Sequence, residues 1–381
     1  MSLVIKSFSF KDIIFSVFIF IVVFVGNATI SNFPLNIFLP VLALFFISQF
    51  QASIKQFIFA IFFTFIFFIY AVNLNVDYNP LYSLWVISFI VSYFAVIVLN
   101  FRINIRSDAT LNAMFYVCGF LLLFFSIPML TGSGSGGDRA AFLFGPNMLY
   151  RIVAFLGATV AGYLFFTNRT SLAVFVSVFC FYLLLLTGSR GGLLSMAILV
   201  LSLLHCHFKS FSFKTLLYVP VFVVFLALIS GLVNFEAYRS FNFSAMGLDR
   251  NSSYIDAYVR LRPYLYFLYE PDRFSMIGID YKTWLDHFYI PGFSYPHSLI
   301  LELVMFYGFF GVCFSIYLLY KIFSVFRAML ISVVSPAHIF YYSFFAFGMG
   351  TFLSGDMGDN GAFMGIVVAM CTKKFKIQSS G

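Results

Sequence analysis

Residues suited to binding an anion gather in a tight polar turn between two apolar segments. The turn reads Thr187-Gly188-Ser189-Arg190-Gly191-Gly192. Its glycines allow a sharp reversal and leave backbone amides open, and the amides and dipole of the following helix favour negative charge, as does a guanidinium. The turn therefore predicts a site for a phosphate-like group that includes Arg190, Ser189 and Gly191. The alternative is a plain reversal whose arginine reaches lipid phosphate.

Two more arginines stand near apolar segments. Arg139 closes the glycine-rich loop 131–139, and Arg151 lies one turn into the segment that Pro146 opens. The loop has no strand before it and no βαβ unit around it, so it is no dinucleotide site. We expect it to be a hinge that lets Arg139 move. An arginine placed against a membrane needs a reason, and we predict that both bind substrate.

A long charged segment, 233–296, is followed by His297. Arg260 and Arg262 lie in a stretch with helical spacing, and because two residues so close face different directions, only one is expected to point into a cleft; which one stays open. Histidine ionises near neutral pH, so His297 can accept or hold a proton. The alternatives are solvated arginines and a histidine that marks the membrane boundary.

Carboxylates are few and do not form a cage for a divalent metal. Glu302 falls inside an apolar run, which makes it a functional or structural-pair candidate. Asp356 and Asp359 follow another apolar run, and we expect them to pair with the arginines. The five cysteines lie in or at the ends of apolar runs without disulfide or metal spacing, and are expected to be core residues. No metal or cofactor is predicted.

The composition requires lipid as solvent for most of the chain. Of 381 residues, 62% are hydrophobic and 9% charged, and the mean hydropathy is +0.99. The apolar runs lack the alternation of a strand barrel, which favours an all-α polytopic membrane protein of one domain, 1–381, with about twelve transmembrane helices. The expected spans are 13–30, 35–50, 56–73, 81–99, 111–130, 147–166, 171–187, 191–207, 214–232, 297–320, 333–353 and 357–372.

The basic residues indicate the orientation, because lysine and arginine in short loops stay cytoplasmic. One face receives most of them, and the short loops 27–34 and 73–80 on the opposite face contain none, which predicts cytoplasmic termini and an extracytoplasmic segment 233–296 between spans 9 and 10. Arg139, Arg151 and Arg190 are the exceptions on the extracytoplasmic face. This pattern explains much of the net charge of +8, so nucleic acid is not an expected partner. The cytoplasmic residues are Lys6, Lys11, Lys55, Arg102, Arg106, Arg169, Lys209, Lys214, Lys321, Arg327, Lys373, Lys374 and Lys376.

In order and topology, these residues resemble the O-antigen polymerase and ligase superfamily of bacterial envelope proteins. The likeness covers most of the chain, although each motif is short. Ser298 departs from the family, which often has asparagine after the histidine. The residues that carry the resemblance are Asp138-Arg139, Gly145-Pro146-Asn147, the 187–192 turn, Arg260 or Arg262 before Pro271 and Gly278, Pro296-His297, and Gly308 with Gly311.

The resemblance implies a fold similar to GT-C glycosyltransferases in the bacterial inner membrane, with the active site facing the periplasm. It implies a metal-independent glycosyltransferase that uses undecaprenyl-diphosphate-linked oligosaccharide, in contact with membrane lipid and with a chain-length regulator membrane protein as a partner. By that likeness Arg190 and Arg139 hold the diphosphate. Arg260 or Arg262 neutralises the leaving group, and His297 orients or deprotonates the acceptor hydroxyl.

Three functions follow from these observations. A polymerase transfers lipid-linked glycan to the non-reducing end of another lipid-linked repeat unit, whereas a ligase transfers it to lipid A-core. The resemblance favours the polymerase, because short Phe-rich chains are common among serotype-specific polymerases. A lipid-linked oligosaccharide flippase is the third, yet a transporter is expected to show repeated halves and polar groups near mid-bilayer, and this sequence shows neither.

Reporter fusions test the orientation. Because the termini are expected inside and the segment 233–296 outside, alkaline phosphatase fused after Asp249 is expected to be active and green fluorescent protein fused after Gly381 to fluoresce. Fusions after Lys209 supply the matched cytoplasmic control. A fluorescent fusion after Asp249 would contradict the orientation.

Overall fold

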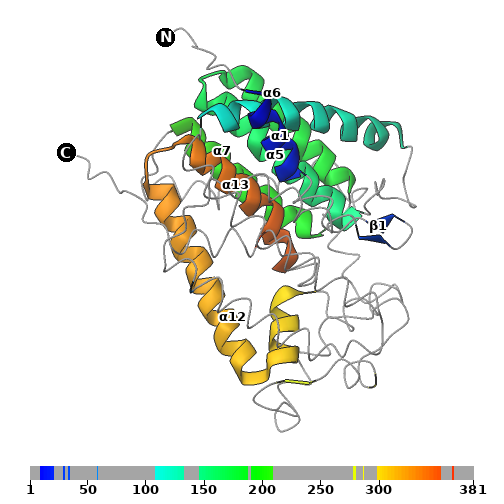
Figure 1. The fold of residues 1–381 in the computed structure, drawn as a ribbon, viewed down its shortest axis with the longest axis vertical. Helices are drawn as coiled ribbons and strands as arrows, with labels where there is room; N and C mark the ends of the chain where they lie inside the picture. Colours follow the sequence, from blue (N-terminus) through cyan, green and yellow to red (C-terminus); the bar gives the residue numbers. More distant parts are fainter. Residues whose placement is uncertain are drawn as a thin grey trace, which may run out of the picture.

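The computed structural model of the chain is built from helices (Figure 1). It describes residues 9–20, 29–30, 33–34, 58, 108–132, 146–187, 190–208, 278–279, 286, 298–352 and 363. The helices are α1 (Phe10–Phe20), the helix Asp108–Thr131, α5 (Pro146–Phe166), α6 (Thr170–Leu186), α7 (Arg190–Phe208), α12 (Leu299–Ile331), α13 (Pro336–Gly348) and the 3-10 turn η8 (Met349–Phe352). Beside them the described residues form one short antiparallel pair, β1 (Thr29–Ile30) with β2 (Phe33–Pro34).

The predicted spans 111–130, 147–166, 171–187 and 191–207 each coincide with a described helix to within a few residues. Within the described ranges, three helices are long and apolar enough to cross a membrane: Asp108–Thr131, Met148–Phe166 and Leu299–Ile331. The chain is therefore a membrane protein. The spans 35–50, 56–73, 81–99, 214–232 and 357–372 lie outside the described residues, apart from isolated positions, so the total of about twelve stays a prediction.

The first predicted span, 13–30, is wrong at its C-terminal end. The helix that covers its start is α1, Phe10–Phe20, whereas Thr29–Ile30 is the strand β1. Thr29 lies opposite Pro34 and Ile30 opposite Phe33. Gly26 and Asn27 stand between these two elements in the sequence, and both residue types are poor helix formers, so hydropathy alone overestimated the length of the helix.

Helix α5 is the central element of the described bundle. It packs against α6, α7 and α13, and nearly all its side chains are buried. Two glycines permit the close approach: a Cβ at Gly157 would lie 2.8 Å from Sγ of Cys180 in α6, and one at Gly162 would lie 3.2 Å from Cγ2 of Ile339 in α13. Small residues at helix interfaces are the usual means of tight packing in a membrane, where no hydrophobic effect drives helices together.

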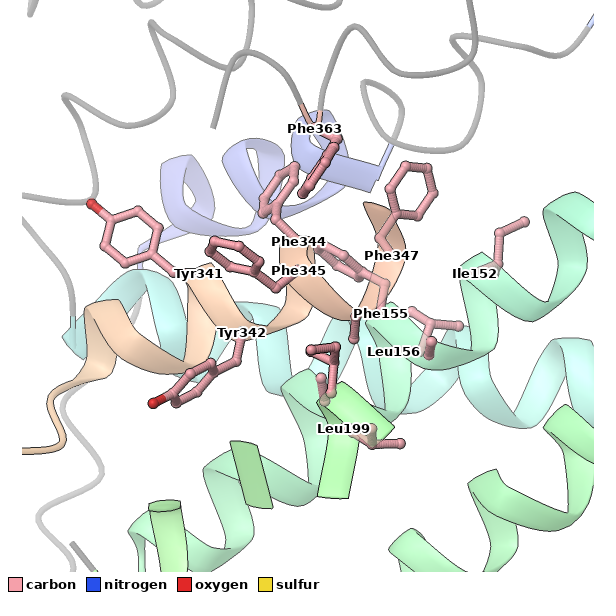
Figure 2. Close-up of a cluster of buried hydrophobic side chains, with 14 of the residues drawn as sticks. Ile152, Phe155, Leu156, Leu199, Tyr341, Tyr342, Phe344, Phe345, Phe347 and Phe363 are labelled. Carbon is pink, nitrogen blue, oxygen red and sulfur yellow. The ribbon is translucent and has the colours of Figure 1, made fainter. Parts of the chain in front are cut away.

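Aromatic side chains fill the space between α5, α7 and α13. Figure 2 shows Phe155 of α5 and Leu199 of α7 in one cluster with the phenylalanines of α13. The rings of Phe155 and Phe344 meet edge to face, with centroids 5.2 Å apart, a favourable geometry for two aromatic quadrupoles. One pair of hydroxyls joins α5 and α13 in the same region: Thr159 Oγ1 and Ser343 Oγ are 2.8 Å apart.

Helix α6 shows which surface faces lipid. Its buried residues form a single stripe with helical spacing, and the opposite face exposes large apolar side chains such as Phe175 and Val178. A soluble protein would place polar residues on that face. The buried residues of α6 are Ala173, Ser177, Cys180, Leu183 and Leu184.

Two helix ends in the bundle have standard caps: the C-terminus of α5 and the N-terminus of α13. After α5, Asn168 takes a positive φ of 62°, and the amide of Arg169 donates to the carbonyl of Leu164, which together make a Schellman ending. Helix α13 begins with Ser335 as N-cap in a capping box with His338, and Pro336 occupies the first turn, where its missing N–H costs nothing.

Helix α12 is broken at Gly308, which corrects the predicted span 297–320. Gly308 has φ 55° and ψ −132°, a conformation that only glycine adopts readily. We call Leu299–Tyr307 the short leg and Phe309–Ile331 the long leg; Figure 1 shows the chain reversing sharply between them. An unbroken helix of 33 residues would be about 50 Å long and exceed the hydrocarbon thickness of about 30 Å.

The two legs have different surroundings. The short leg buries residues in every direction, from Leu299 to Tyr307. The long leg buries one stripe and exposes large apolar side chains on the other side, among them Phe310 and Phe323. The long leg is thus the membrane-exposed part of α12, whereas the short leg is enclosed by protein.

Substituting Gly157 tests the close approach of α5 and α6. A methyl group at Gly157 would lie 2.8 Å from Sγ and 3.1 Å from Cβ of Cys180; rotating the thiol relieves only the first contact. We expect Gly157→Ala to lower stability by about 1–3 kcal/mol, as overpacked cores do. The measurement is thermal unfolding of the purified protein in detergent.

Gly119→Ala is the matched control, because nothing lies within 4 Å of a Cβ at that helical glycine. It should leave the melting temperature unchanged or raise it, since alanine favours the helix by about 1 kcal/mol. Equal melting temperatures for the two variants would refute the packing argument.

Candidate functional site

One end of the bundle brings together the start of α5, the start of α7, the last residues of α6, and η8. Tyr150 of α5 is the common neighbour: a Cβ at Gly192 of α7 would lie 3.6 Å from Cβ of Tyr150, and one at Gly350 of η8 would lie 2.3 Å from its hydroxyl oxygen. Thr187, which ends α6, is 3.9 Å from the same Gly192 position. We call this the site end of the bundle.

Arg151, the residue after Tyr150 in α5, is a buried charged residue of the site end. It is 1% exposed, and its guanidinium carbon lies 5.9 Å from the centroid of the Tyr150 ring, within range of a cation–π contact. A guanidinium stays ionised in a protein, so burying one is expensive and is usually matched by nearby negative charge or acceptors. A buried arginine beside a membrane-spanning bundle is by default a candidate functional residue.

The predicted anion-binding turn leads into a helix that packs on Tyr150, the residue before this arginine. Helix α7 starts at Arg190, so Arg190 and Gly191 belong to its first turn, whose amides lack partners within the helix. Because Gly192 packs on Tyr150, that first turn lies next to the helix segment that carries Arg151. On the other side of the turn, Thr187 is fully buried and its hydroxyl donates to the carbonyl of Leu184 at 2.7 Å.

The short leg of α12 reaches the same end. Its N-cap, Ser298, follows His297 directly in the chain, and the start of the leg lies beside η8, with which α12 is in contact (Figure 1). Glu302, predicted to lie inside a membrane span, belongs to this leg of the candidate span Leu299–Ile331 and is 1% exposed. The N-termini of α5, α7 and the short leg thus occur at one end, and their dipoles together favour negative charge there.

Three glycines make the break in α12. Gly278 has φ +82°, and a Cβ there would lie 2.4 Å from the backbone carbon of Phe306. The next amide, that of Ile279, donates to the carbonyl of Met305 at 2.9 Å, a carbonyl at the end of the short leg where the helix stops. Gly311 has no room for a side chain either, because a Cβ would lie 1.9 Å from the carbonyl oxygen of Leu303.

This junction gives a structural reason for three glycines in the sequence. Gly278, Gly308 and Gly311 stood among the residues that carry the family resemblance, and in the structure they meet at one place. They join the segment around 278 to the short leg. The short leg is therefore held by the segment that precedes it in the chain.

Six predicted site residues lie outside the described residues, and their placement stays a prediction. The side chain of Arg190 is likewise not described. The six are Arg139, Ser189, Arg260, Arg262, His297 and Asp356. Within the part of the chain that the structure describes, no three His, Cys, Asp or Glu residues are grouped so as to hold a metal ion.

A polar cluster at the opposite end of the bundle was missed by the sequence reasoning. His205 of α7 has Nε2 3.0 Å from the carbonyl oxygen of Ser332 and Nδ1 2.5 Å from the hydroxyl of Tyr342. Since a carbonyl only accepts, Nε2 of His205 carries the proton. The signal was available in principle, because a histidine inside an apolar run must find partners when it is buried.

His338 extends the cluster. Its Nδ1 accepts from the amide of Ser335 at 3.1 Å, and its Nε2 lies 2.6 Å from Oγ of Ser332. The two histidines thereby connect the end of α7 to the turn between α12 and α13. This arrangement is at the end away from Tyr150 and Arg151, and its described contacts stabilise that turn.

Searches of protein-family models, curated proteins and solved structures found no match to this chain.

Substituting Gly278 tests the junction. Gly278→Ala is expected to be strongly destabilising, since it combines a positive φ with a contact of 2.4 Å to the backbone of Phe306. We expect lower melting temperature and faster proteolysis of the segment 233–296 in the purified protein.

Gly132→Ala is the control for the backbone angle alone. Gly132 has φ +68° but nothing lies within 4 Å of a Cβ there, so only conformational strain of about 1–3 kcal/mol is expected. If Gly278→Ala were no worse than Gly132→Ala, the close contact with the short leg would be irrelevant to stability.

Proposed function

We propose that this chain is a polymerase of O-antigen or a related surface polysaccharide. It transfers undecaprenyl-diphosphate-linked glycan to the non-reducing end of another lipid-linked repeat unit at the periplasmic face of the inner membrane. The observation that supports this proposal best is the buried Arg151, which follows Tyr150 in α5 at one end of a membrane bundle. The first turn of α7 packs on Tyr150. A lipid diphosphate is an anion that is delivered at the membrane.

The reaction needs positive charge more than it needs a metal. The acceptor hydroxyl forms a bond to the anomeric carbon and loses its proton to a base, while the bond from that carbon to the diphosphate oxygen breaks. Negative charge grows on the diphosphate as it leaves, so fixed donors aimed at it stabilise the transition state. Arg151 and the open end of α7 are such donors, and the sequence adds Arg190 and Arg139.

The remaining roles belong to the extracytoplasmic segment and the short leg. His297 orients or deprotonates the acceptor, and Arg260 or Arg262 neutralises the leaving diphosphate. Two observations support a place for His297 near the cations: it directly precedes Ser298, and the short leg that begins there lies beside η8. Asp356, a few residues beyond η8 in the chain, is a candidate partner for an arginine.

Deleting the gene in its own host and examining the surface polysaccharide on a gel tests the function. A polymerase mutant leaves lipid A-core that carries a single repeat unit, because ligation continues without chain growth. Accumulation of polymerised glycan on the lipid carrier, with bare core, would identify a ligase instead. An unchanged ladder would refute both functions.

Complementation tests the site. Wild type should restore the ladder, whereas Arg190→Ala and His297→Ala should reduce it at least about 100-fold, the loss typical of a fixed transition-state donor or a general base. The matched control is Arg169→Ala, an exposed arginine at the opposite end of the bundle, which should restore the ladder fully. Full rescue by the first two variants would refute the site and leave the family proposal standing.

A further inference from the structure

Tyr150 holds a hydroxyl that no group in the described part of the chain binds. Its side chain is fully buried, at 0% exposed, and the hydroxyl has no hydrogen-bond partner. A buried hydroxyl without a partner costs free energy, because it has given up water and gained nothing. Phenylalanine, by far the commoner aromatic residue in this chain with 58 copies against 23 tyrosines, would fill the same space without that cost.

The position of the Tyr150 hydroxyl indicates which kind of group would accept its hydrogen bond. It belongs to the site end, where Gly350 of η8 lies against it, and Arg151 is the next residue in the helix. The guanidinium of Arg151 and the first-turn amides of α7 are donors, as is a phenol O–H. Among the described residues no acceptor pairs with the Tyr150 hydroxyl, so a ligand with acceptor oxygens would supply the bond that it lacks.

We propose that Tyr150 is a ligand-binding residue that donates its hydroxyl hydrogen bond to a phosphate oxygen of the lipid-linked diphosphate. The inference rests on the proposed function, whose substrate carries this group, and it adds a residue that no sequence pattern singled out. Because η8 covers the hydroxyl, the ligand reaches it when η8 shifts. Gly350 makes the contact with Tyr150, so the cover at that point is backbone without a side chain.

The substitution Tyr150→Phe removes this hydroxyl and little else. The full-length protein in nanodiscs is titrated with undecaprenyl diphosphate, and binding is followed as the rise in melting temperature that a ligand of the folded state produces. We expect Tyr150→Phe to need about tenfold more ligand for the same rise, the loss typical of one hydrogen bond to a charged group. Without ligand its melting temperature should equal or exceed that of wild type.

Two variants and one probe are the controls. Ser315→Ala removes another buried, unpartnered hydroxyl, from the long leg of α12, and should leave the titration unchanged. Tyr342→Phe removes a hydroxyl that is bonded to His205, and should lower the melting temperature without weakening binding. Undecaprenol, which has the lipid chain and no phosphate, should not distinguish Tyr150→Phe from wild type.

Each other outcome counts against the proposal. An unchanged titration of Tyr150→Phe with diphosphate would overturn it while leaving the polymerase proposal intact. A fall in the ligand-free melting temperature like that of Tyr342→Phe would show that the hydroxyl is structural. If wild type did not respond to undecaprenyl diphosphate at all, both this inference and the anion site of the proposed function would fail, and the polysaccharide gel would then decide the function separately.

Discussion

The described bundle depends on the close burial of α5 among α6, α7 and α13. In lipid the apolar faces of helices gain little from meeting one another, so contact must come from shape, and Gly157 and Gly162 supply it by bringing backbones together. The same burial sets the register of the bundle: α5 and α7 run parallel, and their first turns are level at Tyr150 and Gly192. A site built from two helix starts requires that alignment.

Charge placement follows from this geometry. The site end collects Arg151 and the start of α7, whereas Arg169 and the histidine cluster lie at the other end. Lipid solvates neither the arginine nor open amides, so both must be matched by protein groups or by what the protein binds. The aromatic cluster between the two ends keeps the polar groups apart and gives the bundle its rigidity.

Hydropathy predicted the helices Asp108–Thr131, α5, α6 and α7 well, because an apolar run long enough to cross lipid has few alternatives to a helix. It failed at Gly308, since residues 303–320 continue without a charged residue while the backbone reverses. It also failed near Thr29, where a short strand pair follows α1. Of the predicted site residues, Arg151 is the one whose side chain the structure describes, and it is buried; the site itself stays a prediction. Tyr150 carries no signal in a chain so rich in aromatic residues, and only its missing hydrogen bond distinguishes it.

The break in α12 gives its two legs different tolerance to substitution. The long leg exposes one face to lipid, where one bulky apolar residue can replace another at little cost. The short leg is buried on all sides, and the carbonyl of Met305 accepts the hydrogen bond of the Ile279 amide. Because Gly278 meets the short leg at its backbone, this junction demands glycine at 278 and leaves the choice of short-leg side chains to their other neighbours.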